Sequence, residues 1–142
     1  MLNRMPVHIN VHNMIQQGKE KEEITFYTTG EYFEKDESIY LSYEEEHDFG
    51  RVKSLLKISK DETLLMRSGA VKMRQRFQEG QTTSTNYETP FGTMRLVTQT
   101  KSLTFSTNEK QKHGTLRLEY DLDLGHEKHV HILTIQYKEE TK

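Results

Sequence analysis

Evenly spaced turn signals are the sequence feature that most constrains the fold of this chain. The eight glycines stand at positions 18, 30, 50, 69, 80, 92, 114 and 125, with gaps of one or two units of about 11 residues. Where a glycine is missing at the halfway point, a polar turn sequence stands there instead: EKDES at 34–38, SKDET at 59–63 and STNEK at 106–110. This spacing predicts a series of short β-hairpins.

The segments between these turns alternate polar and apolar residues with a period of two, which is typical of a strand with one buried face. Such segments are VHINV (7–11), SIYLSY (38–43), RVKSLLKI (51–58), VKMRQRF (71–77) and HVHILTIQY (129–137). The clearest is TLRLEYDLDL at 115–124, whose expected core face carries Leu116, Leu118, Tyr120, Leu122 and Leu124. Its other face carries the charged residues Arg117, Glu119, Asp121 and Asp123.

These features predict an all-β protein in which residues 1–142 form a single domain, an antiparallel up-and-down β-barrel of about ten strands. A sheet of that many strands does not easily stay flat, so it curls into a barrel or splits into a sandwich. Short connections throughout the chain favour the barrel, because Greek-key sandwiches need longer crossovers. A sandwich is the alternative.

Composition narrows the expected partners and the expected compartment. Twenty basic and 22 acidic residues give a net charge of −2, so no field of the whole molecule attracts nucleic acid or an anionic membrane. The chain has no cysteine, which excludes disulfides, a zinc ribbon and a thiolate nucleophile. Its N-terminus lacks the apolar stretch of a signal peptide, and no membrane-spanning run of apolar residues occurs. We therefore expect a cytoplasmic protein that binds neither membranes nor nucleic acid.

Several segments resemble a known family. They are GAVKMRQRFQEGQ at 69–81, NYETPFGTM at 86–94, and the strand GTLRLEYDLDL at 114–124 with the last strand at 128–138. In these segments, and over nearly the whole chain, the sequence resembles the YwiB-like family of small uncharacterised bacterial proteins. The resemblance implies a calycin-like β-barrel that is related in shape to the lipocalins. Lipocalins bind small apolar molecules in the barrel. The resemblance implies no activity, cofactor or catalytic residue.

The stretch TNYETPFGT at 85–93 interrupts the alternating pattern. Pro90 fixes φ and lacks an N–H donor, while Gly92 permits positive φ, so TPFG is interpreted first as a turn. The functional interpretation is a loop at the mouth of the barrel, in which Tyr87 and Phe91 would form the aromatic walls of a ligand site.

A basic face lies on the segment VKMRQRF, where Lys72, Arg74 and Arg76 alternate with apolar residues. If Arg74 and Arg76 point into the barrel, their guanidinium groups would clamp a carboxylate or phosphate, and the ligand would be anionic. A shift of one residue in register turns the apolar residues inward and sends the arginines to water. Burial favours this second orientation, in which the arginines pair with carboxylates or remain solvated.

Four histidines are candidate metal ligands. His8 and His12 share a face of the first strand, and His129 and His131 share a face of the last. If these two strands pair, the four imidazoles gather, but a metal needs nitrogen atoms that converge within about 2.0–2.1 Å of one centre. Alternating histidines on a strand are more typical of a polar, solvated face. We therefore expect no metal and no cofactor.

The function expected from these features is the binding of a small molecule at the mouth or in the interior of the barrel. One alternative is a small enzyme, a hydrolase or lyase, that uses His, Arg and carboxylate side chains facing the barrel. The sequence has no nucleophile elbow, phosphate-binding glycine loop or HExxH motif to support catalysis. A third alternative is a module that binds protein or RNA through its surface.

Overall fold

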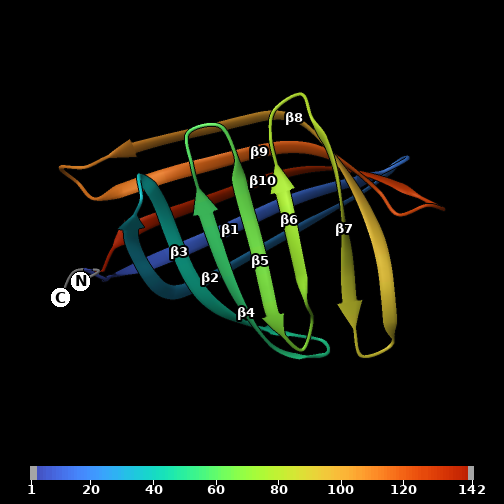
Figure 1. The fold of residues 1–142 in the computed structure, drawn as a ribbon, viewed down its shortest axis with the longest axis horizontal. Coiled ribbons are helices and arrows are strands. Elements are labelled where there is room, and N and C mark those ends of the chain that lie inside the picture. The colour runs from blue at the N-terminus through green and yellow to red at the C-terminus, as the bar shows by residue number, and fades with distance from the viewer. Residues whose placement is uncertain (1–2, 141–142) are drawn as a thin grey trace.

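The computed structural model describes residues 3–140, which form ten antiparallel β-strands and contain no helix that could cross a membrane. Short turns join the strands (Figure 1). The strands are β1 (Met5–Gln17), β2 (Glu20–Lys35), β3 (Ser38–His47), β4 (Gly50–Ile58), β5 (Thr63–Gly69), β6 (Met73–Phe77), β7 (Thr82–Thr89), β8 (Gly92–Asn108), β9 (His113–Asp123) and β10 (Lys128–Glu139). The predicted all-β class is confirmed.

The strands form one sheet in the order β6-β5-β4-β3-β2-β1-β10-β9-β8-β7. Consecutive strands are therefore neighbours, and the first strand pairs with the last along a ladder from Val7–Glu139 to Gln16–Val130. Figure 1 shows β9, β10, β1, β2 and the second half of β8 running along the long axis of the molecule, while β3 to β7 and the first half of β8 cross them steeply. This is an up-and-down order, as predicted.

The two ends of this order, β6 and β7, meet without forming a regular ladder. Lys72 and Glu88 exchange two backbone hydrogen bonds of 2.9 Å, and the Thr83 hydroxyl donates to the Arg76 carbonyl at 2.8 Å. These bonds close the sheet on itself at two points. The fold is therefore a nearly closed barrel rather than a sandwich, and we call the junction of β6 and β7 the seam.

Apolar side chains from most of the strands fill one part of the barrel interior. Those with less than 2% of their surface exposed are Val7, Ile9, Leu41, Val52, Leu56, Val71, Phe77, Leu116, Leu118 and Ile135. Each contributes about 1.5–3 kcal/mol by leaving water. On β9, Tyr120 is also buried, and Leu122 and Leu124 continue the same face half-buried. The core face predicted for residues 115–124 is confirmed.

The neighbouring strands β2 and β3 pair over only part of their length. Their ladder runs from Gly30–Tyr43 to Lys35–Ser38, whereas β2 pairs with β1 from Glu20 to Tyr32. Residues 20–29 of β2 therefore separate from residues 44–47 of β3. A Cβ atom at Gly30 would lie 2.2 Å from the carbonyl oxygen of Ser42, so only glycine allows the close backbone approach at the point of separation.

Candidate functional site

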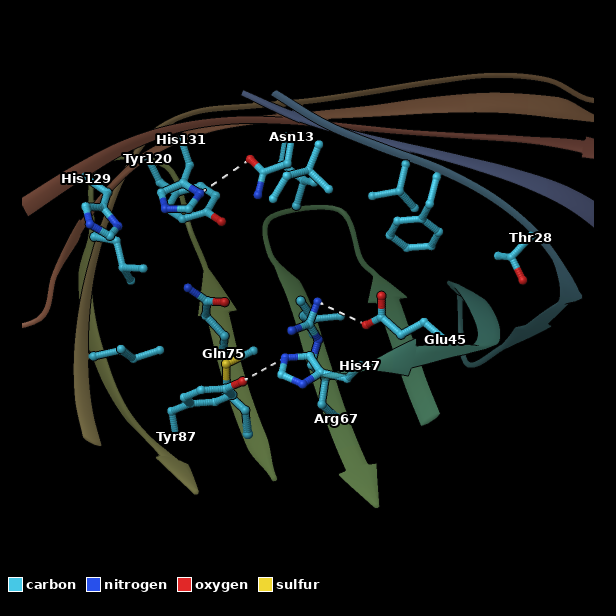
Figure 2. A pocket seen from close by; sticks show the side chains of 18 of the residues that line it. Asn13, Thr28, Glu45, His47, Arg67, Gln75, Tyr87, Tyr120, His129 and His131 are labelled. Atoms are coloured by element: carbon cyan, nitrogen blue, oxygen red, sulfur yellow. Dashed lines mark hydrogen bonds and ion pairs between the residues drawn. The ribbon is translucent and has the colours of Figure 1, made fainter. Parts of the chain in front are cut away.

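Beyond the apolar core, the barrel contains a cavity of about 850 Å³ that is open to solvent. Every strand except β4 contributes side chains to its wall, and the wall includes the segments of β2 and β3 that have separated. The apolar part consists of Val11, Ile24, Phe26, Leu65, Met73, Met94, Leu96, Leu122, Leu124 and Leu133. A cavity of this volume falls in the range of natural small-molecule sites. Figure 2 shows its polar side chains on two facing walls.

One wall carries an ion pair between Arg67 of β5 and Glu45 of β3. Arg67 Nη2 lies 3.4 Å from Glu45 Oε1, and the two side chains are 25% and 15% exposed. Both strands pair with β4, where the buried Ser54 stands opposite Arg67 and Val52 stands opposite Glu45. These two β4 residues have short side chains. The guanidinium group therefore reaches across β4 to the carboxylate.

The same wall continues to the rim of the barrel through aromatic contacts. The Tyr87 hydroxyl lies 3.4 Å from His47 Nε2, and the His47 ring lies 5.0 Å from the ring of Phe49. Phe49 contacts Phe91 edge to face with ring centroids 5.3 Å apart. The β3–β4 and β7–β8 turns therefore meet at the rim, where Phe91 remains 84% exposed.

The facing wall is built by β1, β9 and β10 around His131, which is only 6% exposed (Figure 2). Its ring stacks on Tyr120, with centroids 4.8 Å apart and planes 7° apart. Its Nδ1 lies 3.4 Å from the Asn13 side-chain oxygen, an acceptor, so the proton of the neutral ring belongs on Nδ1. His129 lies beside it, with ring centroids 5.8 Å apart.

Burial changes the protonation of this wall. Loss of water, together with the neighbouring His129, lowers the pKa of His131 from 6.5 to about 4, so its imidazole is neutral at pH 7. Burial also raises the pKa of the Tyr120 phenol, which stays protonated. Within residues 3–140, His131 Nε2 and Arg67 Nε are buried without a hydrogen-bond partner. Such unpaired polar atoms are uncommon in protein interiors.

This barrel has relatives among known proteins. A family described as a domain of unknown function, DUF1934, matches residues 9–138. The chain belongs to the DUF1934 family. It is 42% identical over 139 residues to the uncharacterised β-barrel protein YwiB of Bacillus subtilis, covering 97% of this chain and 96% of that protein. The crystal structure of YwiB matches with a TM-score of 0.90, over 97% of this chain and 94% of the other.

In this DUF1934 barrel, the basic residues of β6 face away from the cavity. Arg74 and Arg76 are exposed on the outer face, and Arg76 pairs with Glu62 at 3.3 Å. Val71, Met73, Gln75 and Phe77 are turned inward. The inward orientation that the anionic-ligand hypothesis required is therefore wrong. The outward register, favoured by burial, is the one that the structure has.

The two predicted aromatic residues of the DUF1934 chain have different positions. Tyr87 lines the cavity, whereas Phe91 lies on the rim, in the tight turn of residues 90–91. The Phe91 amide donates to Thr89 Oγ1, and this hydroxyl donates to the Gly92 carbonyl, both at 3.1 Å. Gly92 has a φ of +136°. The turn interpretation of TPFG is confirmed.

The four histidines do not gather, although β1 and β10 pair. His8 and His12 lie on the outer face, where His12 Nε2 is 2.6 Å from Glu23 Oε1. His129 and His131 face the cavity, so the expected solvated face is wrong for this pair. In the part of the DUF1934 chain that the structure describes, His, Asp and Glu form no cluster of three that could hold a metal.

Sequence reasoning missed Glu45, Arg67, Asn13 and Gln75 as cavity residues. A signal was present, because each lies in phase with the inward apolar residues of its own strand: Glu45 follows Leu41 and Tyr43, and Arg67 follows Leu65. A polar residue at an inward position indicates either a partner across the barrel or a ligand. Gln75 has such a partner, donating to Thr98 Oγ1 at 2.9 Å.

Proposed function

We propose that this DUF1934 protein binds a small molecule inside the barrel. The observation that carries the proposal is the cavity of about 850 Å³, which combines an apolar lining with polar side chains on two facing walls. Natural ligand sites have this composition, with a few polar groups that orient the ligand among many apolar ones.

The separation of β2 from β3 supplies a route of entry. Side chains of residues 24 and 26–28 on β2 and of residues 44–47 on β3 border the cavity after the ladder between these strands has ended. A ligand that enters here would meet the ion pair on one side and the His131–Tyr120 stack on the other. Both pairs are held by neighbouring strands, so the site is formed before the ligand binds.

Binding can be measured with the uncharged dye Nile red, whose fluorescence rises in an apolar environment. Leu122→Trp places a larger side chain at the cavity wall, where Leu122 is half-buried, and we expect it to weaken dye binding about tenfold or more. The matched control is Thr104→Trp, which adds the same ring on the exposed face of β8. Circular dichroism and the melting temperature establish that both variants are folded.

The control variant should bind the dye as the wild type does. A double variant, Arg74→Ala with Arg76→Ala, should also bind normally, because these side chains lie outside the barrel. Undiminished binding by folded Leu122→Trp, or equal losses in Leu122→Trp and Thr104→Trp, would show that the dye does not occupy the cavity and would refute the proposed function.

A further inference from the structure

The charged groups of the cavity balance one another. Arg67 and Glu45 are its partly buried charges, and they form an ion pair with each other at 3.4 Å. The other two carboxylates at the cavity border, Glu44 and Glu46, are exposed at the rim and pair with Arg51 outside the barrel, at 3.9 and 3.3 Å. The interior therefore carries no net charge from this wall.

On the facing wall, His129 Nε2 lies 3.3 Å from Glu127 Oε1, so a charge on this imidazole is balanced within the pair. His131 is almost fully buried and stacks on Tyr120, and this environment keeps the imidazole neutral at pH 7. Beside it, the Asn13 side chain supplies an uncharged amide. Hydrogen bonds at His131 and Asn13 therefore involve neutral donors and acceptors.

A charged ligand would meet an unfavourable environment in such a cavity. Moving an ion out of water into a site lined mostly by apolar side chains is unfavourable unless a group of opposite charge is available to pair with it. Arg67 and Glu45 already neutralise each other, so an anion would have to take Arg67 from Glu45, and a cation would have to take Glu45 from Arg67. Either exchange leaves one buried charge without its partner.

The shape of the side chains indicates a flat ligand. Phe26, Tyr87, Tyr120 and His131 bring four rings to the cavity, and leucine side chains occupy much of the remaining wall. Aromatic rings stack or meet edge to face, and such pairs add to the energy of burial. Amide groups of Asn13 and Gln75 lie among these rings and offer neutral hydrogen bonds.

We infer that the ligand is an uncharged aromatic molecule with amide-like polar groups, and that the balanced Arg67–Glu45 pair excludes charged molecules of the same shape. The inference rests on the proposed function, because it concerns the same cavity. It differs from the anionic ligand that the sequence predicted only for an inward orientation of Arg74 and Arg76.

The test compares three molecules of the same ring size: naphthamide, which is neutral, naphthoate, which is an anion, and naphthylmethylamine, which is a cation at pH 7. Their dissociation constants are measured by competition with Nile red and by calorimetry. We expect the wild type to bind naphthamide about tenfold or more tightly than either charged analogue.

Two variants test whether the ion pair sets this preference. Glu45→Gln leaves Arg67 without its carboxylate, so the tightest analogue should become naphthoate. Arg67→Gln leaves Glu45 without its guanidinium group, so the tightest should become naphthylmethylamine. The double variant, Glu45→Gln with Arg67→Gln, removes both charges and should prefer naphthamide again, which also controls for loss of stability in the single variants.

The outcomes separate this inference from the proposed function. If Nile red occupies the cavity and naphthoate or naphthylmethylamine binds the wild type as tightly as naphthamide, the inference about ligand charge is wrong, but the proposed function is not contradicted. The same holds if the dye binds but none of the three analogues displaces it. If the dye itself does not occupy the cavity, the proposed function falls as well.

Discussion

His8 and His131 belong to paired strands, yet their surroundings give them different chemistry. His8 lies on the outer face of β1 in water, whereas His131 of β10 is only 6% exposed and stacks on Tyr120. A buried imidazole loses the hydration that stabilises its charged form, so its pKa falls to about 4. The imidazole of His131 therefore takes up a proton at a lower pH in the folded protein than in the unfolded chain.

The consequence is a testable dependence of stability on pH. Between pH 6.5 and about 4, the unfolded chain holds a proton at His131 that the folded protein does not, so the free energy of unfolding falls as the pH is lowered through this window. The loss from His131 amounts to at most ~3 kcal/mol. We expect His131→Phe, which keeps a ring on Tyr120, to show a weaker pH dependence in urea unfolding across this window.

The comparison variant is His8→Gln, because His8 is exposed. It should keep the pH dependence of the wild type, including the part that comes from carboxylates. Parallel pH profiles for His131→Phe and the wild type would mean that His131 takes up its proton at the same pH in the folded and unfolded states.

At the scale of single elements, β2 shows what a glycine does inside a strand. Gly30 stands where β2 begins to pair with β3, and a Cβ atom there would lie 2.2 Å from Ser42 O and 2.9 Å from Ile9 Cδ1. The Ser42 oxygen belongs to the backbone and cannot rotate away. We expect Gly30→Ala to lower the free energy of unfolding by about 1–3 kcal/mol, measured by urea denaturation.

The neighbouring exposed residue provides the control. Thr29→Ala changes the next side chain of the same strand and should cost less than about 1 kcal/mol. Equal free energies of unfolding for Gly30→Ala and the wild type would show that β2 and β3 can move apart here without loss of stability.

Gly30 also shows where sequence analysis reached its limit. Six of the eight glycines have positive φ, at or beside the turns, as the spacing predicted, but Gly30 and Gly114 lie within strands beside a neighbouring backbone or the Tyr137 ring. A sequence pattern cannot distinguish a turn glycine from one that permits close packing, because the contact comes from a distant residue. The number of strands and the buried face of β9 were predictable from the turn spacing and local alternation, and the up-and-down order was predictable from the short connections.

The candidate site was less predictable than the fold, again for a physical reason. Arg74 and Arg76 form the more conspicuous pair in the sequence, yet the pleat turns them outward, while the single Arg67 of β5 is turned inward beside Glu45. Whether an inward polar residue has a partner depends on strand order and register. Alternation alone fixes neither.

For the whole molecule, the seam between β6 and β7 divides regions of different expected stability. β1 has a hydrogen-bonded ladder on both sides, with β2 and with β10, whereas β6 and β7 meet through the Lys72–Glu88 bridge and the bond from Thr83 to Arg76. Local opening requires fewer broken bonds at the seam. The barrel is thus expected to open there before it unfolds as a whole.

Native-state hydrogen exchange measures this difference. We expect amides of β1 and β10 to exchange most slowly and those of β6 and β7 that face the seam to exchange much faster, at a rate that responds little to mild denaturant. The β1–β2 ladder, which is continuous from Met5 to Gln17, serves as the internal reference. Uniform protection on both sides of the seam would contradict local opening.

The pairing of β1 with β10 also shapes how the protein is made. Every other ladder joins strands that follow each other in the chain and can form as a local hairpin, but this one joins the first strand to the last. Contacts between such distant segments slow folding, because a long loop must close first. During synthesis, one edge of β1 can pair with β2, but its other edge stays unpaired until β10 leaves the ribosome. The unfinished chain therefore exposes an edge that is prone to aggregation, on a strand that lies near the middle of the strand order in the finished sheet.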